Sequence, residues 1–518
     1  MNFKSHFITT SEYQALHPKG VVAASDPYFA TLANKIFRAL LAEKLIKNDF
    51  DELFLRKIAL KSASYLEDTV SKWGLFDGFR KLNTEICGKQ LPFYTITEDY
   101  YTDEINIEDV QFLVWSTLQE NVIINGENFV VNPDNPMIMF LSSLVYEMLD
   151  EEYETAPEND NIRLLLHEID IEDFIAFRRL LEWLCYNSYL STFRAIETIE
   201  SLKVTIRKKF IRNINYVKHF NYLVESNGVL CYACTPLSVK ALDWFRSITT
   251  NARMLERTKD LTFRAFQRYK IKGSDDSFIY LESFSEDKKE ISLARKSIDK
   301  LNINHTREFS KGNDIVQTSL VFYDNIWQIN GISVFGKMTE KIQAEEDQKV
   351  EEKKFYKETS FKNYQDILKH NRNKEIAFFK NSADLEKFWK KVFSDASNID
   401  DFIKNHPYKN ENNLVLFCHP KNDAVIMPDI AKCINYPGNE LYQSHDSENE
   451  GLSLLTGGFS APLEFLEFII HNNYIPDAHI NSLKSPERGK MIIQENKWFI
   501  VRFFQNELFD ESIMEDNK

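Results

Sequence analysis

The stretch IVQTSLVFYDNIWQINGISV, residues 315–334, decides the fold of the middle of this chain. Its two halves, 315–323 and 327–334, favour the alternation of half-buried β-strands over the stripe of an amphipathic helix. The three residues between them, Asp324-Asn325-Ile326, suit a short hairpin connection. We therefore predict two antiparallel strands joined by a tight turn.

Three runs upstream show the same pattern and extend the predicted sheet. They are Phe266–Lys272, Phe278–Glu282 and Lys289–Ile298, and a turn at 273–276 separates the first two. Four or five short strands with one tight hairpin suit a small barrel or a strongly curved sheet. Such barrels often bind peptides or nucleic acid, and many only pack against a neighbouring domain, so we expect no more than a scaffolding role here.

Apolar residues recur at helical spacing on the N-terminal side of this module, from about residue 30 to residue 118. Gly74 is predicted to end one of these helices. Asn106 is predicted to cap another that begins at Ile107, with Asp109 at its third position as in a weak capping box. Residues 170–222 favour two or three further helices.

The part that follows the strands begins with a charged segment. Residues 337–360 are rich in Glu, Lys and Gln and predict an exposed helical connector. Beyond it, Leu414–Cys418 is a candidate buried strand, a short helix is expected between Pro428 and Pro437, and Trp498–Phe504 suits a strand or a helix.

Together these patterns predict an α+β fold that is predominantly α-helical. Because 518 residues exceed the roughly 250–300 at which one core stops growing, we expect several domains. Low counts of glycine, 15, and proline, 14, favour long helices over a turn-rich β protein. The expected parts are a helical domain over 1–250, a small β-barrel or curved-sheet module over 251–336, the connector over 337–360, and an α+β domain over 361–518.

Charge and hydropathy restrict the classes of partner. The formal net charge of −15 repels phosphate backbones and anionic lipid surfaces. The longest strongly apolar run, Pro136–Leu149, is too short to span a bilayer. The first residues also lack the pattern of a secretory signal. We therefore expect a cytoplasmic protein with no membrane association.

One segment reverses the local charge. Cations between residues 203 and 218 are interleaved with aromatic residues, which could grip phosphates and stack on bases. Alternatively, the cations form a solvated helix face and pair with acids at 147–173, while the aromatics point into the core. The candidate nucleic-acid-binding residues are Lys203, Arg207, Lys208, Lys209, Arg212 and Lys218.

Six cysteines are too few for a disulfide framework, and most lie in apolar surroundings. Cys231 and Cys234 form a CxxC pair, a spacing that can hold zinc when other ligands complete the site. Cys418, His419 and Cys433 could in principle supply them. Buried, reduced thiols are the simpler interpretation, and we predict no cofactor.

Four further residues are candidates for a site. Asp99 and Asp103 lie in a cluster of acidic residues flanked by aromatics, which could hold Mg²⁺ or Ca²⁺ but lacks the glycine of a calcium loop. A solvated loop before a helix is the simpler explanation. His419 follows a predicted strand and His471 lies near a predicted helix end, where sites often occur, although packing roles explain single histidines as well.

Several segments resemble an uncharacterised family of large Bacteroidota proteins classed only as a domain of unknown function. They are ITTSEYQALHP (8–18), DPYFATLAN (26–34), LPFYTITEDYYTDEINIEDVQFLVW (91–115), IMPDIAKCINYPGNELY (426–442) and NNYIPDA (472–478). The resemblance implies a bacterial, cytosolic setting and brings no activity, ligand or catalytic residue.

The function that these observations favour is that of an intracellular interaction or scaffold protein without catalytic activity. Spacings typical of nucleotide-binding loops, hydrolases, zinc proteases, kinases and deaminases do not occur in the sequence. The expected partner is therefore a protein. A nucleic-acid-associated factor that uses the 203–218 segment is the second hypothesis, and an enzyme with a non-standard site is the third.

Overall fold

The computed structural model describes residues 7–43, 46, 50–299, 314–394, 396–397, 399–420, 423–445 and 447–514. The chain divides into two compact units. Unit 1 comprises residues 1–127, 133–347 and 509–518, and unit 2 comprises residues 128–132 and 348–508. Within the described ranges, no helix combines the length and the apolar character needed to cross a membrane.

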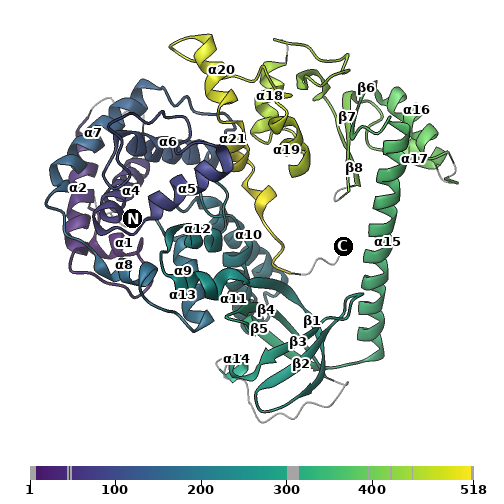
Figure 1. Cartoon of the computed structure of the whole chain (residues 1–518), viewed down its shortest axis with the longest axis horizontal. Coiled ribbons are helices and arrows are strands. Elements are labelled where there is room, and N and C mark those ends of the chain that lie inside the picture. The colour runs from purple at the N-terminus through teal and green to yellow at the C-terminus, as the bar shows by residue number, and fades with distance from the viewer. Residues whose placement is uncertain are drawn as a thin grey trace. The chain divides into compact units, whose positions relative to one another are not determined.

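Unit 1 begins with a series of helices (Figure 1). They are α1 (Thr10–Gln14), α2 (Asp26–Ala42), α4 (Glu52–Ser71), α5 (Leu75–Cys87), α6 (Ile107–Ile124), α7 (Pro136–Tyr153), α8 (Asp160–His167), α9 (Phe174–Tyr186), α10 (Phe193–Lys209), α11 (Ile214–Cys231), α12 (Ala241–Ile248) and α13 (Ala252–Lys259).

The helix α4 is the centre of this helical part, because it packs against α2, α5, α6 and α7. Asp51 caps its start by accepting a hydrogen bond from the Phe54 amide at 2.7 Å. It ends at Ser71, and Gly74, at φ 78°, begins the turn into α5. The left-handed residue that ends α4 is Lys72, at φ 55°, so the predicted stop at Gly74 is wrong by two residues, and Gly74 instead precedes α5 as its N-cap.

The start of α6 is correct at Ile107, but the predicted capping box is wrong. The Asn106 side chain makes no cap hydrogen bond and instead donates to the carbonyls of Tyr101 and Glu104. Asp109 is fully buried and points toward Tyr65. The loop and the core therefore take both side chains away from the helix terminus.

The strands of unit 1 close into a five-stranded barrel in the order β1-β2-β3-β5-β4. All neighbours are antiparallel except β3 and β5, which are parallel. The strands are β1 (Thr262–Ser274), β2 (Phe278–Ser283), β3 (Glu290–Ala294), β4 (Asp314–Tyr323) and β5 (Ile326–Lys337). The interior consists of Tyr269, Ile271, Ile279, Leu281, Ile291, Leu293, Val316, Leu320 and Ile329.

The predicted hairpin is present and its turn is tight. Asp324 and Asn325 have φ values of 52° and 62°, the pair of positive angles that a type I′ turn needs. The third predicted strand is too long, because β3 ends at Ala294 and α14 (Arg295–Asp299) follows. The segment 300–313 between α14 and β4 lies outside the described residues.

Buried polar side chains join the barrel to the helices of unit 1. Asn330 of β5 accepts a hydrogen bond from Arg178 at 2.8 Å and donates to Asn227 and to the Ser226 carbonyl, both at 3.0 Å. Asn330 and Asn227 are completely buried. Buried polar groups without partners are costly in free energy. This network therefore favours one orientation of the barrel relative to α9 and α11.

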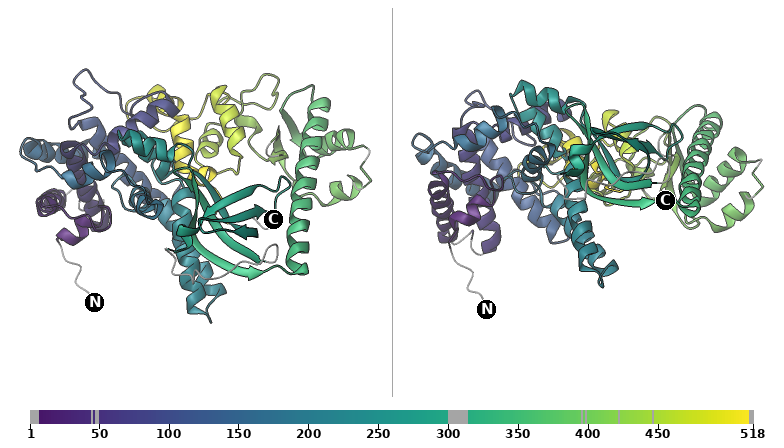
Figure 2. Two further views of the ribbon diagram at one scale, coloured as in Figure 1. Left: turned by 60° about the horizontal axis from the view of Figure 1, so that its bottom comes forward. Right: turned by 90° about the horizontal axis from the view of Figure 1, so that it is seen from below.

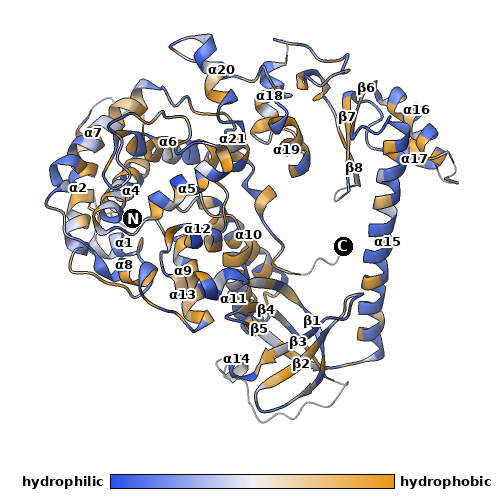
Figure 3. Cartoon of the chain, in the orientation of Figure 1, coloured by the Kyte–Doolittle hydropathy of each residue, from blue (hydrophilic) through white to orange (hydrophobic). Residues whose placement is uncertain are grey.

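The predicted charged connector is helical and longer than expected. It forms the first part of α15 (Glu340–His370), which Figure 3 shows as largely hydrophilic. Unit 2 also contains a sheet in the order β6-β7-β8, formed by β6 (Ile376–Asn381), β7 (Asn412–His419) and β8 (Asp423–Met427). Its helices are α16 (Ser382–Val392), α17 (Ile399–Asn405), α18 (Glu448–Leu455), α19 (Leu463–His471), α20 (Pro486–Gln494) and α21 (Lys497–Phe504).

One prediction for unit 2 is corrected, one strand was not predicted, and one pair of alternatives is resolved. The short helix between Pro428 and Pro437 is a single 3₁₀ turn, Ala431–Cys433, and the strand β8 that precedes it was not anticipated. Trp498–Phe504 is helical. The fold class is confirmed as α+β and mostly helical, with a small barrel and a separate sheet.

Candidate functional site

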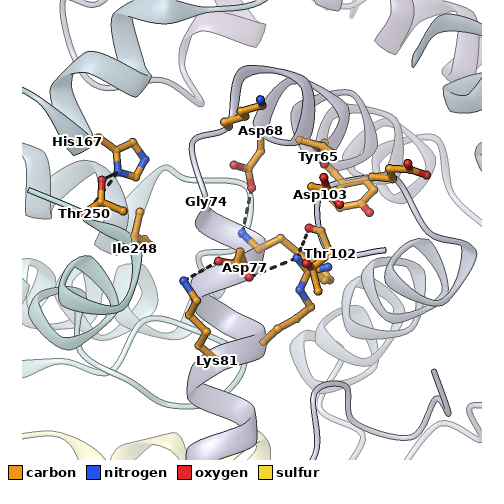
Figure 4. Close-up of a pocket in the computed structure, with 15 residues that line it drawn as sticks. Tyr65, Asp68, Gly74, Asp77, Lys81, Thr102, Asp103, His167, Ile248 and Thr250 are labelled. Atoms are coloured by element: carbon orange, nitrogen blue, oxygen red, sulfur yellow. Dashed lines mark hydrogen bonds and ion pairs between the residues drawn. The ribbon is translucent and has the colours of Figure 1, made fainter. Parts of the chain in front are cut away.

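A pocket of about 360 Å³ opens in unit 1 beside α4 and α5 (Figure 4). Tyr65, Asp68, Asp77 and Lys81 on these two helices form much of its wall. The loop before α6 adds residues 102–104, and Figure 4 shows His167 and Thr250 together at another side. The concentration of ionisable groups makes this pocket the first place to look for chemistry.

Asp68 is the buried acid of the pocket. Its carboxylate accepts hydrogen bonds from the backbone amides of Leu75 at 3.2 Å and Phe76 at 3.0 Å, and from the Tyr189 hydroxyl at 2.7 Å. Burial raises the pKa of Asp68 to about 6, against the opposing effect of these donors. The residue therefore caps α5 from the neighbouring helix, because the amides it binds are the free donors of that helix start.

A second buried acid lies behind the pocket. Asp109 accepts hydrogen bonds from Tyr65 and Tyr100, both at 2.7 Å, and forms an ion pair with Arg80 at 3.3 Å. Burial raises the pKa of Asp109 to about 6. Arg80 also donates to the Thr102 carbonyl at 2.6 Å, so this cluster holds the loop before α6 against α5.

Three other ionisable side chains of the pocket wall also have partners in the protein. Asp77 pairs with Lys81 at 2.7 Å, and His167 contacts the Trp73 carbonyl at 3.0 Å and the Thr250 hydroxyl at 3.2 Å. Groups that are held by their neighbours in this way stabilise the wall. The arrangement favours a structural role for the pocket over acid–base chemistry.

The four candidate residues lie in different settings. Asp103 lines the pocket and is exposed, and its carbonyl accepts a hydrogen bond from the Tyr153 hydroxyl at 3.3 Å. Asp99 is exposed in the loop before α6. In unit 2, His419 is the half-buried last residue of β7, and His471 ends α19 with its ring centroid 6.0 Å from that of Trp498.

Both members of the CxxC pair are buried. The Cys231 thiol lies 3.7 Å from the Ser512 carbonyl, and the Cys234 thiol lies 3.5 Å from the Val239 carbonyl. Burial raises the pKa of Cys231 to about 12. Because zinc binds the thiolate, this environment favours the interpretation as buried, reduced thiols.

The basic segment is divided between paired and solvent-facing cations. Lys203 pairs with Glu200 at 2.8 Å and with Glu225 at 2.6 Å, so its charge is neutralised locally. The other five predicted residues, Arg207, Lys208, Lys209, Arg212 and Lys218, are exposed. Tyr216 is half exposed, and the rings of Phe210 and Phe220 stack on each other with centroids 5.1 Å apart.

One group in the described part of the chain has the composition and spacing to hold a metal ion. It consists of His17, Asp26 and Glu67, whose potential ligand atoms lie within 4.8 Å of one another. No pattern in the sequence points to this group, because its residues are distant in the chain and match no ligand spacing. Two of them, His17 and Asp26, do fall within the segments that carry the family resemblance.

The comparisons with known proteins place the chain in one family. A family model described as "Protein of unknown function (DUF3843)" matches residues 8–312 and 323–506. Neither the search of curated proteins nor the search of solved structures finds a match.

Proposed function

We propose, from the premise that this chain belongs to the DUF3843 family of proteins of unknown function, that it is an intracellular, non-enzymatic interaction protein. The end of the α10–α11 hairpin, residues 204–219, is the binding surface, and we call it the hairpin tip. The partner is a protein that presents an apolar patch rimmed by carboxylates. The observation that carries this proposal is the exposure of aliphatic side chains among cations.

Three aliphatic residues of the hairpin tip are unusually open to solvent. Ile211 is 77% exposed, Ile214 is 66% exposed and Val204 is 47% exposed. Single exposed apolar residues are ordinary on protein surfaces, but a cluster rimmed by polar residues is typical of an interaction site. Figure 2 shows the hairpin projecting from the other helices of unit 1, which leaves this end accessible.

The cations of the hairpin tip determine the chemistry of the partner. Residues 204–219 contain two arginines, three lysines and no acidic residue, in a chain whose formal charge is −15. At physiological salt the Debye length is about 8 Å, so the distant acids of the chain are largely screened at this projecting end. The local field therefore attracts carboxylates.

A protein partner fits this surface better than a nucleic acid. Base stacking needs free aromatic faces, and the rings of Phe210, Tyr216 and Phe220 stack on one another instead. Phe220 also meets Phe266 of β1 edge-on at 6.3 Å, which fixes the hairpin to the barrel. The groups left for recognition are aliphatic side chains and cations, which match an apolar patch with an acidic rim.

Site-specific photocrosslinking of the full chain tests this proposal. A crosslinking residue at Ile211 should capture a defined protein from a lysate of the natural host, whereas the same residue at Leu483 should not. Leu483 is the matched control, because it is 81% exposed and lies in unit 2. Binding of the identified partner is then measured with purified proteins.

The double variant Ile211→Asp/Ile214→Asp should weaken that binding at least tenfold, because burial of one isoleucine contributes about 1.5–3 kcal/mol. Leu483→Asp should bind as the wild type does. The triple charge reversal Lys208→Glu/Lys209→Glu/Arg212→Glu should also weaken binding and reduce its dependence on salt. Reversal of the exposed Lys19, Lys259 and Lys404 is the control.

Two results would overturn the proposal. The first is a partner whose affinity is unchanged by the double isoleucine variant. The second is nuclease-sensitive binding of DNA or RNA at low salt that the charge reversal abolishes and the isoleucine variant leaves intact, which would identify a nucleic-acid-associated factor instead.

A further inference from the structure

A second site is independent of the hairpin tip and lies inside the helical part of unit 1. His17 follows α1, Asp26 is the first residue of α2, and Glu67 belongs to α4. The His17 Nε2 atom lies 2.9 Å from Glu67 Oε2, and His17 Nδ1 lies 3.4 Å from Asp26 Oδ1. The three side chains have at most 1% of their surface exposed.

Neighbouring donors hold the carboxylate of Glu67. Its Oε2 accepts a hydrogen bond from the Tyr13 hydroxyl at 2.5 Å, and its Oε1 accepts one from the Asn159 amide at 2.8 Å. Burial, and to a smaller extent the negative charge of Glu67, raises the pKa of Tyr13 well above its usual value. The hydroxyl therefore keeps its proton. These donors fix the position and orientation of the Glu67 carboxylate.

Asp26 is held on one side only. Its Oδ2 accepts hydrogen bonds from the Gln14 amide at 2.7 Å and from the Ala23 backbone amide at 3.0 Å. Its Oδ1 and the Nδ1 of His17 are both buried and have no hydrogen-bond partner. These two atoms lie 3.4 Å apart without forming a hydrogen bond, so each is left without one in a buried position.

Two arrangements can complete this site, a metal-free ion pair and a bound divalent cation, and they differ in net charge. Two ionised carboxylates and an imidazolium leave a net charge of −1 in a buried position, which is costly without further compensation. The first turn of α2 offsets a part of this at Asp26. Two carboxylates, a neutral imidazole and a divalent cation sum to zero, and the cation also supplies a partner for the buried Asp26 Oδ1 atom.

We propose that His17, Asp26 and Glu67 bind a divalent transition-metal ion as a structural site. Imidazole nitrogen and carboxylate oxygen are ligands that Zn²⁺ and related ions accept at about 2.0–2.2 Å, so donors of one ion lie up to about 4.4 Å apart. The donor atoms here lie within 4.8 Å of one another, which requires shifts of only tenths of an ångström. Tyr13, Gln14 and Asn159 form the outer shell that orients the carboxylates.

The ion would link the segment after α1 and the start of α2 to the central helix α4. Binding uses the neutral imidazole, so an imidazolium at His17 would release its proton to solvent as the ion enters. Because the ligands are enclosed, the ion is acquired during folding and does not exchange with substrate. This role is structural and places no reaction at the site.

Metal analysis of the full chain tests the proposal. Protein purified without chelator should contain one transition-metal ion per chain. After unfolding, chelation and refolding, titration with Zn²⁺, Mn²⁺ or Co²⁺ should raise the melting temperature and saturate at one equivalent. Co²⁺ should also quench tryptophan fluorescence, because the Trp73 ring centroid lies 5.6 Å from that of His17.

Variants locate the ion. Glu67→Gln and His17→Gln should each lower the affinity for the ion at least tenfold, whereas His479→Gln should not. His479 is the matched control, since it forms a histidine–carboxylate contact with Glu448 at 3.3 Å in unit 2. Asn159→Ala should weaken binding less than the ligand variants, and it supplies a readout if those do not fold.

Wild-type protein that lacks bound metal and shows no saturable response to the three ions would overturn the proposal. A metal-free cluster of His17 and the two carboxylates would then be the correct description. Equal metal content in the wild type and in a folded Glu67→Gln variant would place the ion elsewhere and would overturn it as well.

Discussion

The replacement of Asp68 by asparagine tests whether the buried acid of the pocket serves the fold. The wild-type carboxylate binds the amides of Leu75 and Phe76 and the Tyr189 hydroxyl. Asparagine has one oxygen, and its NH₂ group faces at least one of these donors. A buried donor without a partner costs about 1–3 kcal/mol, so we expect this loss in the free energy of unfolding at pH 8.

The raised pKa of Asp68 predicts the direction in which the stability loss of Asp68→Asn changes with pH. The folded pKa of Asp68 is about 6, above the unfolded value of about 3.9. The folded state therefore binds the proton more tightly, and the stability that this contributes is lost as pH rises from about 4 through 6. At pH 5 the wild type retains part of this stability, and the variant has none of it. The decrease in the free energy of unfolding caused by Asp68→Asn should therefore be about 1.4 kcal/mol larger at pH 5 than at pH 8.

Urea unfolding at both pH values, followed by circular dichroism, measures the difference. Hydrogen exchange of the α5 amides reports whether the loss is at the helix that Asp68 caps. Asp77→Asn is the control, because Asp77 lines the same pocket but is partly exposed and should change stability by only about 0–1 kcal/mol. Equal stability of Asp68→Asn and wild type at both pH values, or a larger loss at pH 8, would refute the reasoning.

Three other predictions concern packing and buried charge. A Cβ at Gly78 would lie 2.7 Å from the Ile248 Cγ1 atom, so Gly78→Ala should cost about 1–3 kcal/mol in urea unfolding, and Ile248→Ala should relieve part of it. Burial lowers the pKa of Lys61 to about 8, so the folded state loses that proton first and the stability of the wild type relative to Lys61→Met should rise by about 3 kcal/mol between pH 8 and 10.5. Asn330→Ala leaves the Arg178 guanidinium without one buried acceptor and should cost about 1.5–3 kcal/mol, with faster hydrogen exchange where the barrel meets α9 and α11.

A specific result would contradict each of these three predictions. A fully stable Gly78→Ala would mean that α5 and α12 pack less closely than described. A stability difference between wild type and Lys61→Met that falls or stays flat above pH 8 would mean that Lys61 is not buried. Unchanged exchange in Asn330→Ala would mean that the polar network does not hold the barrel in place.

The strands of the barrel, the connector and the main helices could be predicted from local pattern. Period-two alternation and the Asp324-Asn325 turn predicted the barrel hairpin, because both depend on residues that are neighbours in the chain. Local pattern failed where distant groups compete for a side chain. Asn106 and Asp109 read as a capping box, yet the loop and Tyr65 bind them more favourably in the folded protein.

The sequence by itself also determined the charge reversal at 204–219, and the folded chain determines which residues there meet solvent. Lys203 is half-buried and pairs with two glutamates, whereas Ile211 is exposed. The group of His17, Asp26 and Glu67 was beyond sequence reasoning. Its members are separated by 9 and 41 residues, and only the packing of α1, α2 and α4 brings their polar atoms together and removes water from around them. Sequence determines such features when contacts are local, and tertiary structure decides them when burial brings distant charges together.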